Sequence, residues 1–333
     1  MRPRFQIPAP DHFLNTIRAL RLVQRDRRIT AGSQFPRSLA RNAQREDEAA
    51  IALLDAWNRH HCDTQVLIWT RHTPRPMAPA TIPPEVTELA DQLLLAQRQV
   101  LGDQLLGLYL FGSATTGAFE SGISDVDTVA VLVDEPSDTE IAALAVMHEH
   151  LARDRPDWAD RVEVDYLSAD AIAQFRSKSR PAARISPGEP FHRIQIDRRW
   201  ITDWYQVLKN GIALYGPPPD EVFPPITTSE LVDAVRAQLG DWPERISNAS
   251  RPGQLAYAVL TLCRALRICS TGDSVSKKDA AVWARTEMPK FRRVIEDALA
   301  VRYPDAGMTR QSQPNRPDVL RLCQVVIERC TKR

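Results

Sequence analysis

Four residues in the first half of the chain have the types and spacing of a site for a metal ion and phosphate. Gly112 and Ser113 follow an apolar run, and Asp125 and Asp127 open the next one. Residues two apart in a strand point to the same side, so the two carboxylates should project together. Magnesium fits such a pair best, because it prefers hard oxygen ligands and often combines one or two carboxylates with substrate phosphates. Glycine at 112 would let the backbone approach a phosphate, and the Ser113 hydroxyl could donate to a phosphate oxygen.

A second acidic pair, Glu163 and Asp165, lies on a segment that indicates another strand. Residues 161–167 alternate between polar and apolar types, which is typical of a half-buried strand. This arrangement would bring a third carboxylate beside the first pair, as general base for an attacking hydroxyl or as a further metal ligand. Asp-x-Asp alone is common in loops, and Gly-Ser at a strand end is usually a turn. The prediction therefore depends on the whole combination.

The elements around these residues predict a sheet that could position them. Apolar runs at 105–111 and 127–133 indicate buried strands, and amphipathic patterns predict helices at 85–101 and 139–153. The order helix, strand, loop, strand, helix, strand favours a small mixed sheet with helices on one face. A loop rich in proline and serine is expected at 177–190.

After residue 197 the pattern is mostly helical, so the expected fold class is α+β: a small mixed sheet followed by an all-helical bundle. The expected helices lie at 200–210, 229–239, 254–270, 277–285, 290–303 and 318–329. We expect the sheet domain to span 77–190 and the helical domain to span 191–333.

Residues 1–76 differ from the rest, since they contain many arginines and no lysine. One helix is expected at 43–59, and a proline-rich linker follows from residue 73. We expect a poorly ordered basic extension here, and a nucleic-acid tether is the alternative. Met77 opens a segment that could be a complete protein, so the extension could also be an artefact of start-site assignment.

Composition disfavours several classes of partner. The 333 residues include 43 Lys and Arg against 42 Asp and Glu, a net charge of +1, which gives no global field for nucleic acid or an anionic membrane. No segment approaches the roughly 20 apolar residues that span a bilayer, and the N-terminus lacks a secretory pattern. Five cysteines without a Cys-x-x-Cys pair indicate neither a disulfide framework nor a zinc site, and Cys263 and Cys269 are expected as packed thiols. A cytoplasmic monomer without a membrane partner is expected.

Two sets of motifs resemble known enzymes. The segment LYLFGSATTGAFESGISDVD resembles the signature of the polymerase-beta-like nucleotidyltransferase superfamily, over about residues 100–170. In the second half, LAYAVLTLCRAL, TGDSVSKKDAAVWARTEMP and GIALYGPPPDEVF resemble the C-terminal domain of the aminoglycoside adenylyltransferases that act on streptomycin and spectinomycin. Together the likeness spans about residues 84–300.

The resemblance implies a nucleotidyltransferase domain that uses Mg²⁺ and takes ATP as co-substrate. Gly112 and Ser113 would contact the triphosphate. Asp125 and Asp127 would hold magnesium, and Glu163 in VEVDYL would match the general base of the family.

The resemblance also implies that Arg264 in LTLCRAL and Lys277 in SVSKK contact the nucleotide phosphates. The alternative for these residues is a solvated helix face and a lysine at a helix start. Because both belong to the helical domain, ATP would lie in a cleft between the two domains.

The chain departs from the family where a cationic aminoglycoside would be held by carboxylates and tryptophans. The corresponding loop reads GDWPERISNASRPGQ, in which Trp242 can stand for one aromatic and Asp241 has no secure match. Gln254 stands where an acid is expected. Trp200 and Trp204 lie nearby and are expected in the core. The acceptor therefore need not be streptomycin.

The function implied is transfer of AMP from MgATP to a hydroxyl of a small molecule, with an aminoglycoside such as streptomycin or spectinomycin as the expected acceptor. Three alternatives stay open. The acceptor could be a protein or another sugar or cyclitol, the chain could be a non-catalytic nucleotide-binding regulator, or the arginine-rich residues 1–76 could bind nucleic acid. The complete set of carboxylates argues against a regulator, because a regulator has no need of a base.

Overall fold

The computed structural model describes residues 82–250, 252–303 and 313–332 of the chain. These residues belong to one unit of the chain, Pro79–Arg333. The expected basic extension at 1–76, with its helix at 43–59, lies outside the described residues.

The described strands form one six-stranded sheet in the order β5-β4-β3-β2-β1-β6. Their bounds are β1 Leu105–Phe111, β2 Val126–Leu132, β3 Val162–Ser168, β4 Arg180–Ser186, β5 Glu189–Ile196 and β6 Ile212–Tyr215. Neighbouring strands are antiparallel except β2 and β3, which run parallel. A parallel pair needs a crossover, and α5 (Asp138–Asp154) supplies it between β2 and β3.

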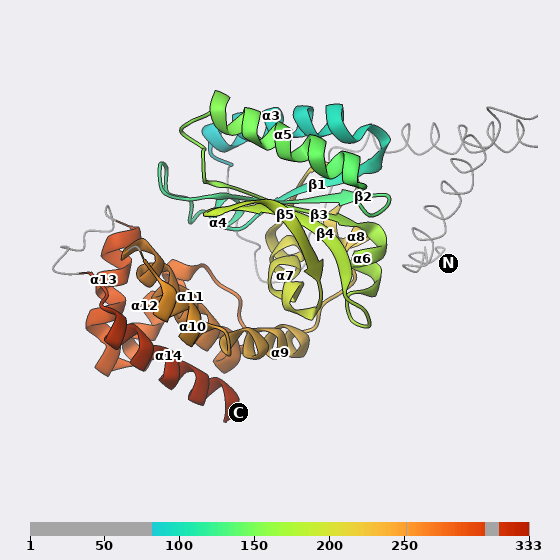
Figure 1. Ribbon diagram of the computed structural model, residues 1–333. Coiled ribbons are helices and arrows are strands. Elements are labelled where there is room, and N and C mark those ends of the chain that lie inside the picture. The colour runs from blue at the N-terminus through green and yellow to red at the C-terminus, as the bar shows by residue number, and fades with distance from the viewer. Residues whose placement is uncertain (1–81, 251, 304–312, 333) are drawn as a thin grey trace, which may run out of the picture. The chain divides into compact units, whose positions relative to one another are not determined.

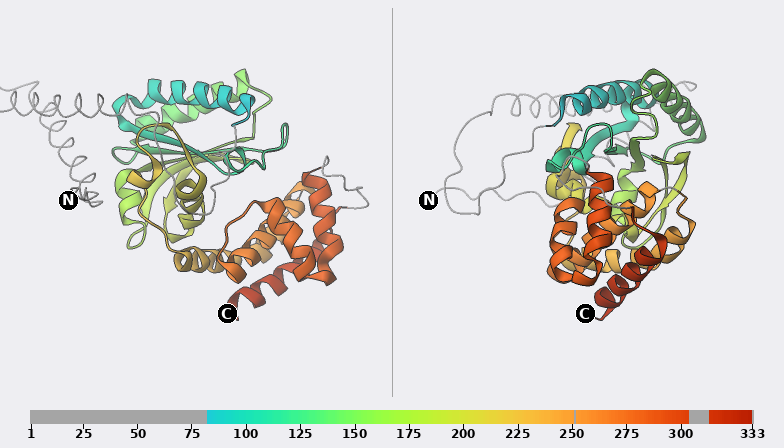
Figure 2. Two further views of the ribbon diagram at one scale, coloured as in Figure 1. Left: turned by 180° about the vertical axis from the view of Figure 1, so that it is seen from behind. Right: turned by 90° about the vertical axis from the view of Figure 1, so that its left-hand side faces the viewer.

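Helices cover both faces of this sheet. Figure 1 shows α3 (Pro84–Leu101) and α5 on one face, and α6 (Ala169–Gln174) and α7 (Ile201–Asn210) on the other. The view from behind in Figure 2 shows the same layers. The expectation of helices on one face only is therefore wrong. The physical reason is that the central strands are apolar on both sides, so each side needs a cover.

Alternate residues of β1 show this two-sided burial. Leu108 and Leu110 belong to the hydrophobic core that includes residues of α3 and α5. Tyr109 points to the opposite face, where its ring lies 5.5 Å from that of Phe223. Trp204 of α7 joins the same cluster, with its ring centroid 6.0 Å from that of Phe223. Trp204 is fully buried, as expected for a core residue.

A β-hairpin occupies most of the segment expected to be a proline- and serine-rich loop. Strands β4 and β5 pair from Arg180 with Ile196 to Ser186 with Glu189. The turn between them contains Gly188, which has a φ of 82°. The expected domain boundary at residue 190 falls inside β5, and β6 returns to the sheet after α7. The loop prediction is wrong because prolines are tolerated near strand ends and on sheet edges, and β5 is an edge strand.

The second half of the chain is a set of packed helices, which confirms the α+β class. They are α9 (Thr228–Leu239), α10 (Trp242–Asn248), α11 (Pro252–Thr271), α12 (Lys277–Glu287), α13 (Arg292–Arg302) and α14 (Arg316–Thr331). Shorter helical turns are α4 (Ser113–Thr116), α8 (Pro219–Val222), η1 (Gly102–Gln104), η2 (Arg198–Trp200) and η3 (Pro289–Phe291). Helix α10 lies in the segment expected to be a loop, and its Pro243 stands in the first turn, where proline is tolerated.

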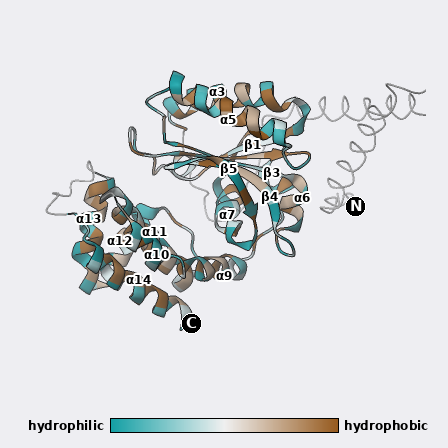
Figure 3. Ribbon diagram, in the orientation of Figure 1, coloured by the Kyte–Doolittle hydropathy of each residue, from teal (hydrophilic) through white to brown (hydrophobic). Residues whose placement is uncertain are grey.

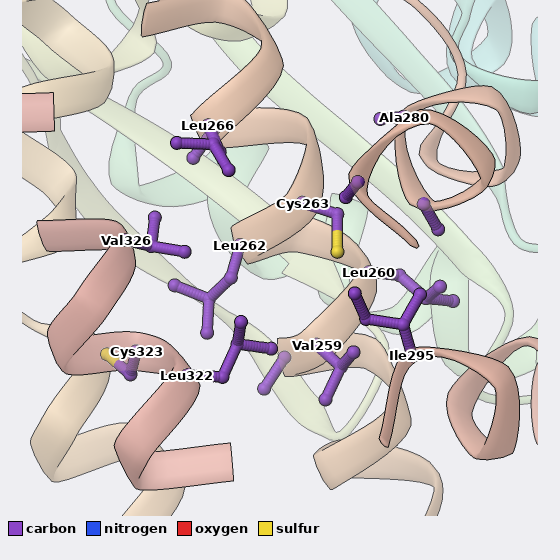
Figure 4. Close-up of a cluster of buried hydrophobic side chains, with 14 of the residues drawn as sticks. Val259, Leu260, Leu262, Cys263, Leu266, Ala280, Ile295, Leu322, Cys323 and Val326 are labelled. Atoms are coloured by element: carbon purple, nitrogen blue, oxygen red, sulfur yellow. The ribbon is translucent and has the colours of Figure 1, made fainter. Parts of the chain in front are cut away.

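Helix α11 lies at the centre of the helical core. Figure 4 shows its side chains Val259, Leu262 and Leu266 among residues of α13 and α14, including Ile295. Cys263 is also fully buried and not in a disulfide, as expected for a packed thiol. This core gives the helical half its own source of stability.

Hydrophobic and hydrophilic segments alternate along helices such as α14 in Figure 3, as in helices with one buried side. Among residues 82–250, 252–303 and 313–332, no helix has both the length and the apolar character needed to cross a membrane.

Candidate active site

Gly112 connects β1 to the short helix α4 and lies directly beside Asp127. Its φ of 76° and ψ of −142° suit glycine and are rarely adopted by other residues. A Cβ added at this position would lie 2.9 Å from Cγ of Asp127 and closer still to its Oδ2 atom. Phe111 pairs with Asp127 across β1 and β2, which brings the end of β1 to this carboxylate. The glycine is therefore required both by its backbone angles and by its neighbour.

The hydroxyl of Ser113 is a candidate phosphate contact. Its Oγ atom is buried and has no hydrogen-bond partner among the residues that the structure describes. The hydroxyls of Thr115 and Thr116, in contrast, both donate to the carbonyl of Gly112. A buried hydroxyl without a partner needs an explanation, and a phosphate oxygen would supply one.

The parallel pairing of β2 and β3 places Asp127 opposite Glu163. Directly paired residues of neighbouring strands lie on the same face of a sheet, so both carboxylates project from one side. Asp165 follows on the same face, opposite Val129 in β2 and Arg184 in β4. The structure thus brings the sequence-predicted acids of two strands onto one surface.

Asp127 is a buried acid among other acids. Burial raises its pKa well above the usual value, and the charges of Asp125 and Glu163 raise it further. Lys277 acts in the opposite direction. The negative charges around Asp127 therefore outnumber the positive charges, which makes its ionised form unfavourable.

The donor set of Asp125 and Asp127 fits magnesium when substrate phosphates complete the coordination. Two carboxylates two residues apart provide hard oxygen ligands, and a divalent cation would offset the repulsion around Asp127. Within the described parts of the chain, no three His, Cys, Asp or Glu side chains converge closely enough to hold a metal ion. Glu163 is turned toward Arg184 and Ser186, so its role as a third metal ligand finds no support here.

Glu163 is a partly buried carboxylate with both oxygens engaged. Its side chain is 16% exposed and forms an ion pair with Arg184. The hydroxyl of Ser186 donates to its Oε2 atom at 2.8 Å. Burial raises the pKa of Glu163, while Arg184 and Ser186 act against that rise. A raised pKa suits a group that must accept a proton near neutral pH.

Asp165 lies deeper than Glu163. It is only 1% exposed and forms an ion pair with Nε of Arg184 at 3.2 Å. Burial raises its pKa well above the usual value, and Arg184 lowers it. A carboxylate enclosed in this way is poorly placed to meet an acceptor hydroxyl, so Glu163 is the better base of the two.

Asp203 on α7 is a site residue that sequence reasoning missed. Burial raises its pKa, and the positive charges of Arg184, Arg264 and Lys277 oppose that rise. Its own charge in turn raises the pKa of Glu163. The sequence gives no sign that Asp203 lies near the other acids, because Asp203 belongs to a separate helix that packs against the sheet.

Arg264 and Lys277 reach the acidic cluster from the helical half of the chain. Both stand within electrostatic reach of Asp203, and Lys277 also acts on Asp127. Arg264 donates to the side-chain oxygen of Gln206 at 3.5 Å, and the Lys277 ammonium lies 4.2 Å from the centre of the Tyr257 ring. Both cations therefore lie close enough to influence the buried acids electrostatically.

Comparisons with known proteins identify enzymes that this chain resembles. Residues 221–329 match the family model described as the C-terminal domain of aminoglycoside adenylyltransferase. The chain resembles the aminoglycoside adenylyltransferases. It is 25% identical over 230 residues to the spectinomycin 9-adenylyltransferase of Staphylococcus aureus, covering 66% of this chain and 85% of that protein. It is also 25% identical over 232 residues to the aminoglycoside (3'') (9) adenylyltransferase of Escherichia coli, covering 67% of this chain and 86% of that protein.

A solved structure has the same fold. The spectinomycin adenyltransferase AAD(9) from Enterococcus faecialis, crystallised with ATP and spectinomycin, superposes with a TM-score of 0.61. At 17% identity, the alignment covers 74% of this chain and 99% of that one. The adenylyltransferase relatives and this fold support nucleotidyltransferase activity for the chain.

The adenylyltransferase-like helical region contains Trp242 and Asp241, the two residues expected to contact the acceptor. Trp242 is 9% exposed and packs in the helical core, with its ring centroid 6.1 Å from that of Tyr257. Asp241 is exposed and precedes α10. This packing leaves little of the Trp242 indole for a ligand, so acceptor contact by these residues stays a prediction.

Two arginines not expected in the site fix the loop that precedes Asp125. Arg161 donates to the carbonyl of Ser124 through Nε and Nη2, at 3.0 and 2.6 Å. Arg302 at the end of α13 donates to the carbonyl of Ile123 at 2.7 Å, and its Nη2 lies 3.7 Å from Oδ1 of Asp125. These contacts limit where the Asp125 carboxylate can lie.

Proposed function

We propose that the chain transfers AMP from ATP, with magnesium, to a hydroxyl of a small-molecule acceptor. The observation that carries this proposal is the pairing of Asp127 with Glu163 beside the Gly112–Ser113 turn. Nucleotidyl transfer needs a phosphate site, a metal ligand and a base, and residues that could supply each of them lie close together here.

The triphosphate would be bound by residues from both halves of the chain. Ser113 would donate its hydroxyl, which has no hydrogen-bond partner among the described residues, to a phosphate oxygen. Gly112 has no side chain to keep a phosphate away from its backbone. Arg264 and Lys277 would offset the charge of the leaving pyrophosphate. Asp125 and Asp127 would hold magnesium, whose charge would offset the negative charge that develops on the transferred group.

Glu163 would accept the proton of the attacking hydroxyl. It is more exposed than Asp165, and Ser186 and Arg184 fix its carboxylate. In-line attack on the α-phosphorus would then release pyrophosphate, and positioning would supply much of the rate.

For the acceptor we propose an aminoglycoside such as spectinomycin or streptomycin, because the similar proteins are named for spectinomycin or for aminoglycosides and the helical region matches the aminoglycoside adenylyltransferase model. Another sugar or cyclitol, or a protein side chain, remains the alternative acceptor. The experiment is a panel assay of pyrophosphate release from ATP, with mass spectrometry of the products. A mass gain of one AMP on the antibiotic supports the proposal, and a gain on protein supports the alternative. No ATP-dependent release with any acceptor argues against enzymatic transfer.

A further inference from the structure

We propose that Arg184 is a positioning residue, which holds the carboxylate of Glu163 in place by joining it to the buried Asp165. The inference rests on the proposed transfer reaction, in which Glu163 is the base. It assigns a function to an arginine on β4 for which the sequence carried no expectation.

The guanidinium of Arg184 is held on three sides. Nη2 pairs with Glu163, and Nε lies 3.2 Å from Oδ1 of Asp165, which is an ion-pair contact without hydrogen-bond geometry. The plane stacks on Trp200, with Cζ 4.5 Å from the ring centroid. Only 19% of the side chain is exposed. A guanidinium held by two ion pairs and a stacked ring has few other positions to occupy.

The neighbours of Arg184 are themselves anchored. Trp200 donates its indole N–H to the carbonyl of Gln195 on β5 at 3.2 Å. Asp165 pairs with Arg184 in the ladder between β3 and β4. Residues anchored to β3 and β5, together with the backbone of β4, therefore hold Arg184 in place.

Glu163 receives this restraint at one oxygen and a second at the other. Arg184 binds Oε1, and the Ser186 hydroxyl donates to Oε2 at 2.8 Å. Two fixed contacts define both the position and the plane of the carboxylate, which matters because a misplaced base loses rate steeply. Arg184 also forms an ion pair with Asp165, so its positive charge interacts with both carboxylates.

A purely structural role is the competing explanation, since Arg184 also compensates the buried charge of Asp165. The two explanations differ in kinetics. Loss of positioning would lower kcat while the KM for ATP stays nearly constant, because the phosphate contacts proposed for Ser113, Arg264 and Lys277 would not involve Arg184. Loss of fold lowers the amount of active enzyme and the melting temperature together.

The test compares Arg184→Gln, Arg184→Lys and the double variant Asp165→Asn with Arg184→Gln, using the antibiotic that the wild type adenylylates. The double variant removes the buried carboxylate along with its partner, so it should fold even where the single variant does not. Arg180→Gln is the matched control, because Arg180 lies on the same strand and pairs with Asp170 outside the acidic cluster.

We expect Arg184→Gln and the double variant to lower kcat by about 10- to 100-fold, in line with the cost of a small misplacement, with the KM for ATP changed less than about threefold. Arg184→Lys should recover part of kcat, and millimolar guanidinium ion should raise kcat of the double variant. The control should keep wild-type kcat. Wild-type kcat in a folded Arg184 variant, or an equal loss in Arg180→Gln, would overturn the inference and leave the proposed function standing. A wild type that transfers no AMP to either antibiotic would instead overturn the proposed acceptor and this inference with it.

Discussion

Gly112 and Asp127 are packed so closely that no side chain larger than hydrogen fits between them. A Cβ on Gly112 would come within 2.9 Å of Cγ of Asp127. The turn that is expected to receive phosphate and the acid expected to hold magnesium are therefore parts of one arrangement. A shift of the Gly112 turn would therefore require a shift of the Asp127 carboxylate.

The first prediction concerns Gly112→Ala. It should lower kcat by at least about 100-fold, because the new methyl must displace a carboxylate where a shift of about 1 Å is already costly. Gly102→Ala is the matched control. Gly102 has a similar backbone, with a φ of 52° and a ψ of −126°, but a Cβ there meets nothing within 4 Å. The control should lose about 1–2 kcal/mol of unfolding free energy and keep its kcat. Equal kcat losses in both variants would attribute the effect to backbone strain alone.

The second prediction separates activity from stability at Asp127. Burial and neighbouring acids raise its pKa, so its ionised form destabilises the fold at neutral pH. The stability that a protonated Asp127 permits is lost as pH rises through its elevated pKa. Asp127→Asn should therefore raise the melting temperature at pH 7 without added magnesium, while kcat falls by roughly three orders of magnitude. Thermal melts and pyrophosphate release measure the two effects. A variant that is both less stable and fully active would refute the assignment.

The third prediction concerns the cations of the helical half. Arg264→Ala and Lys277→Ala should each raise the KM for ATP by about 10- to 100-fold, the loss expected for one charge-assisted contact. Arg267→Ala is the control, because Arg267 lies one turn along α11 and pairs with Asp273 instead. Nucleotide titration and steady-state kinetics provide the readout. An unchanged KM in both site variants would contradict phosphate binding and support the alternative, in which these residues only form a solvated helix face and a helix start.

The fourth prediction is an acid-sensitive loss of stability at His148. Its Nε2 atom lies 2.8 Å from the Tyr166 hydroxyl, and burial lowers its pKa to about 4. The unfolded chain takes up this proton below about pH 6.5 and the folded chain only near pH 4, so stability is lost as pH falls through that window. The full loss is about 3 kcal/mol.

Chemical denaturation at pH 7 and pH 4.5 tests this, with His148→Gln as the variant. The variant should lose less stability than the wild type between the two pH values. His150→Gln, which alters an exposed histidine of the same helix, should behave as the wild type does. Identical pH dependence in all three proteins would show that other groups govern the acid response.

Much of the fold could be predicted because its signals are local. The strands around Gly112 and Asp127 are apolar runs bounded by turn residues, and the helices of the second half have clear periodicity. The β4–β5 hairpin could not be predicted, because its prolines and polar residues conceal the strand pattern. No sequence pattern marks Arg184, because only the pairing of β3 with β4 brings it to Asp165.

Some residues of the candidate site could likewise be predicted from the sequence, and others could not. Asp125, Asp127 and Glu163 carry a spacing that marks them in the sequence. Asp203 and Arg302 carry none, because tertiary packing brings α7 and α13 to the acids. Trp200 was expected in the core, but it is only half-buried and stacks on Arg184.

The most direct test of the account is single-turnover transfer by Glu163→Gln, compared with the wild type. ATP and an accepted aminoglycoside are mixed with excess enzyme, and the AMP-modified antibiotic is followed by mass spectrometry. We expect Glu163→Gln to bind ATP with wild-type affinity and to form the product about 100- to 10,000-fold more slowly, the range for loss of a general base. Product formation at the wild-type rate would contradict the claim that Glu163, placed opposite Asp127, is the base.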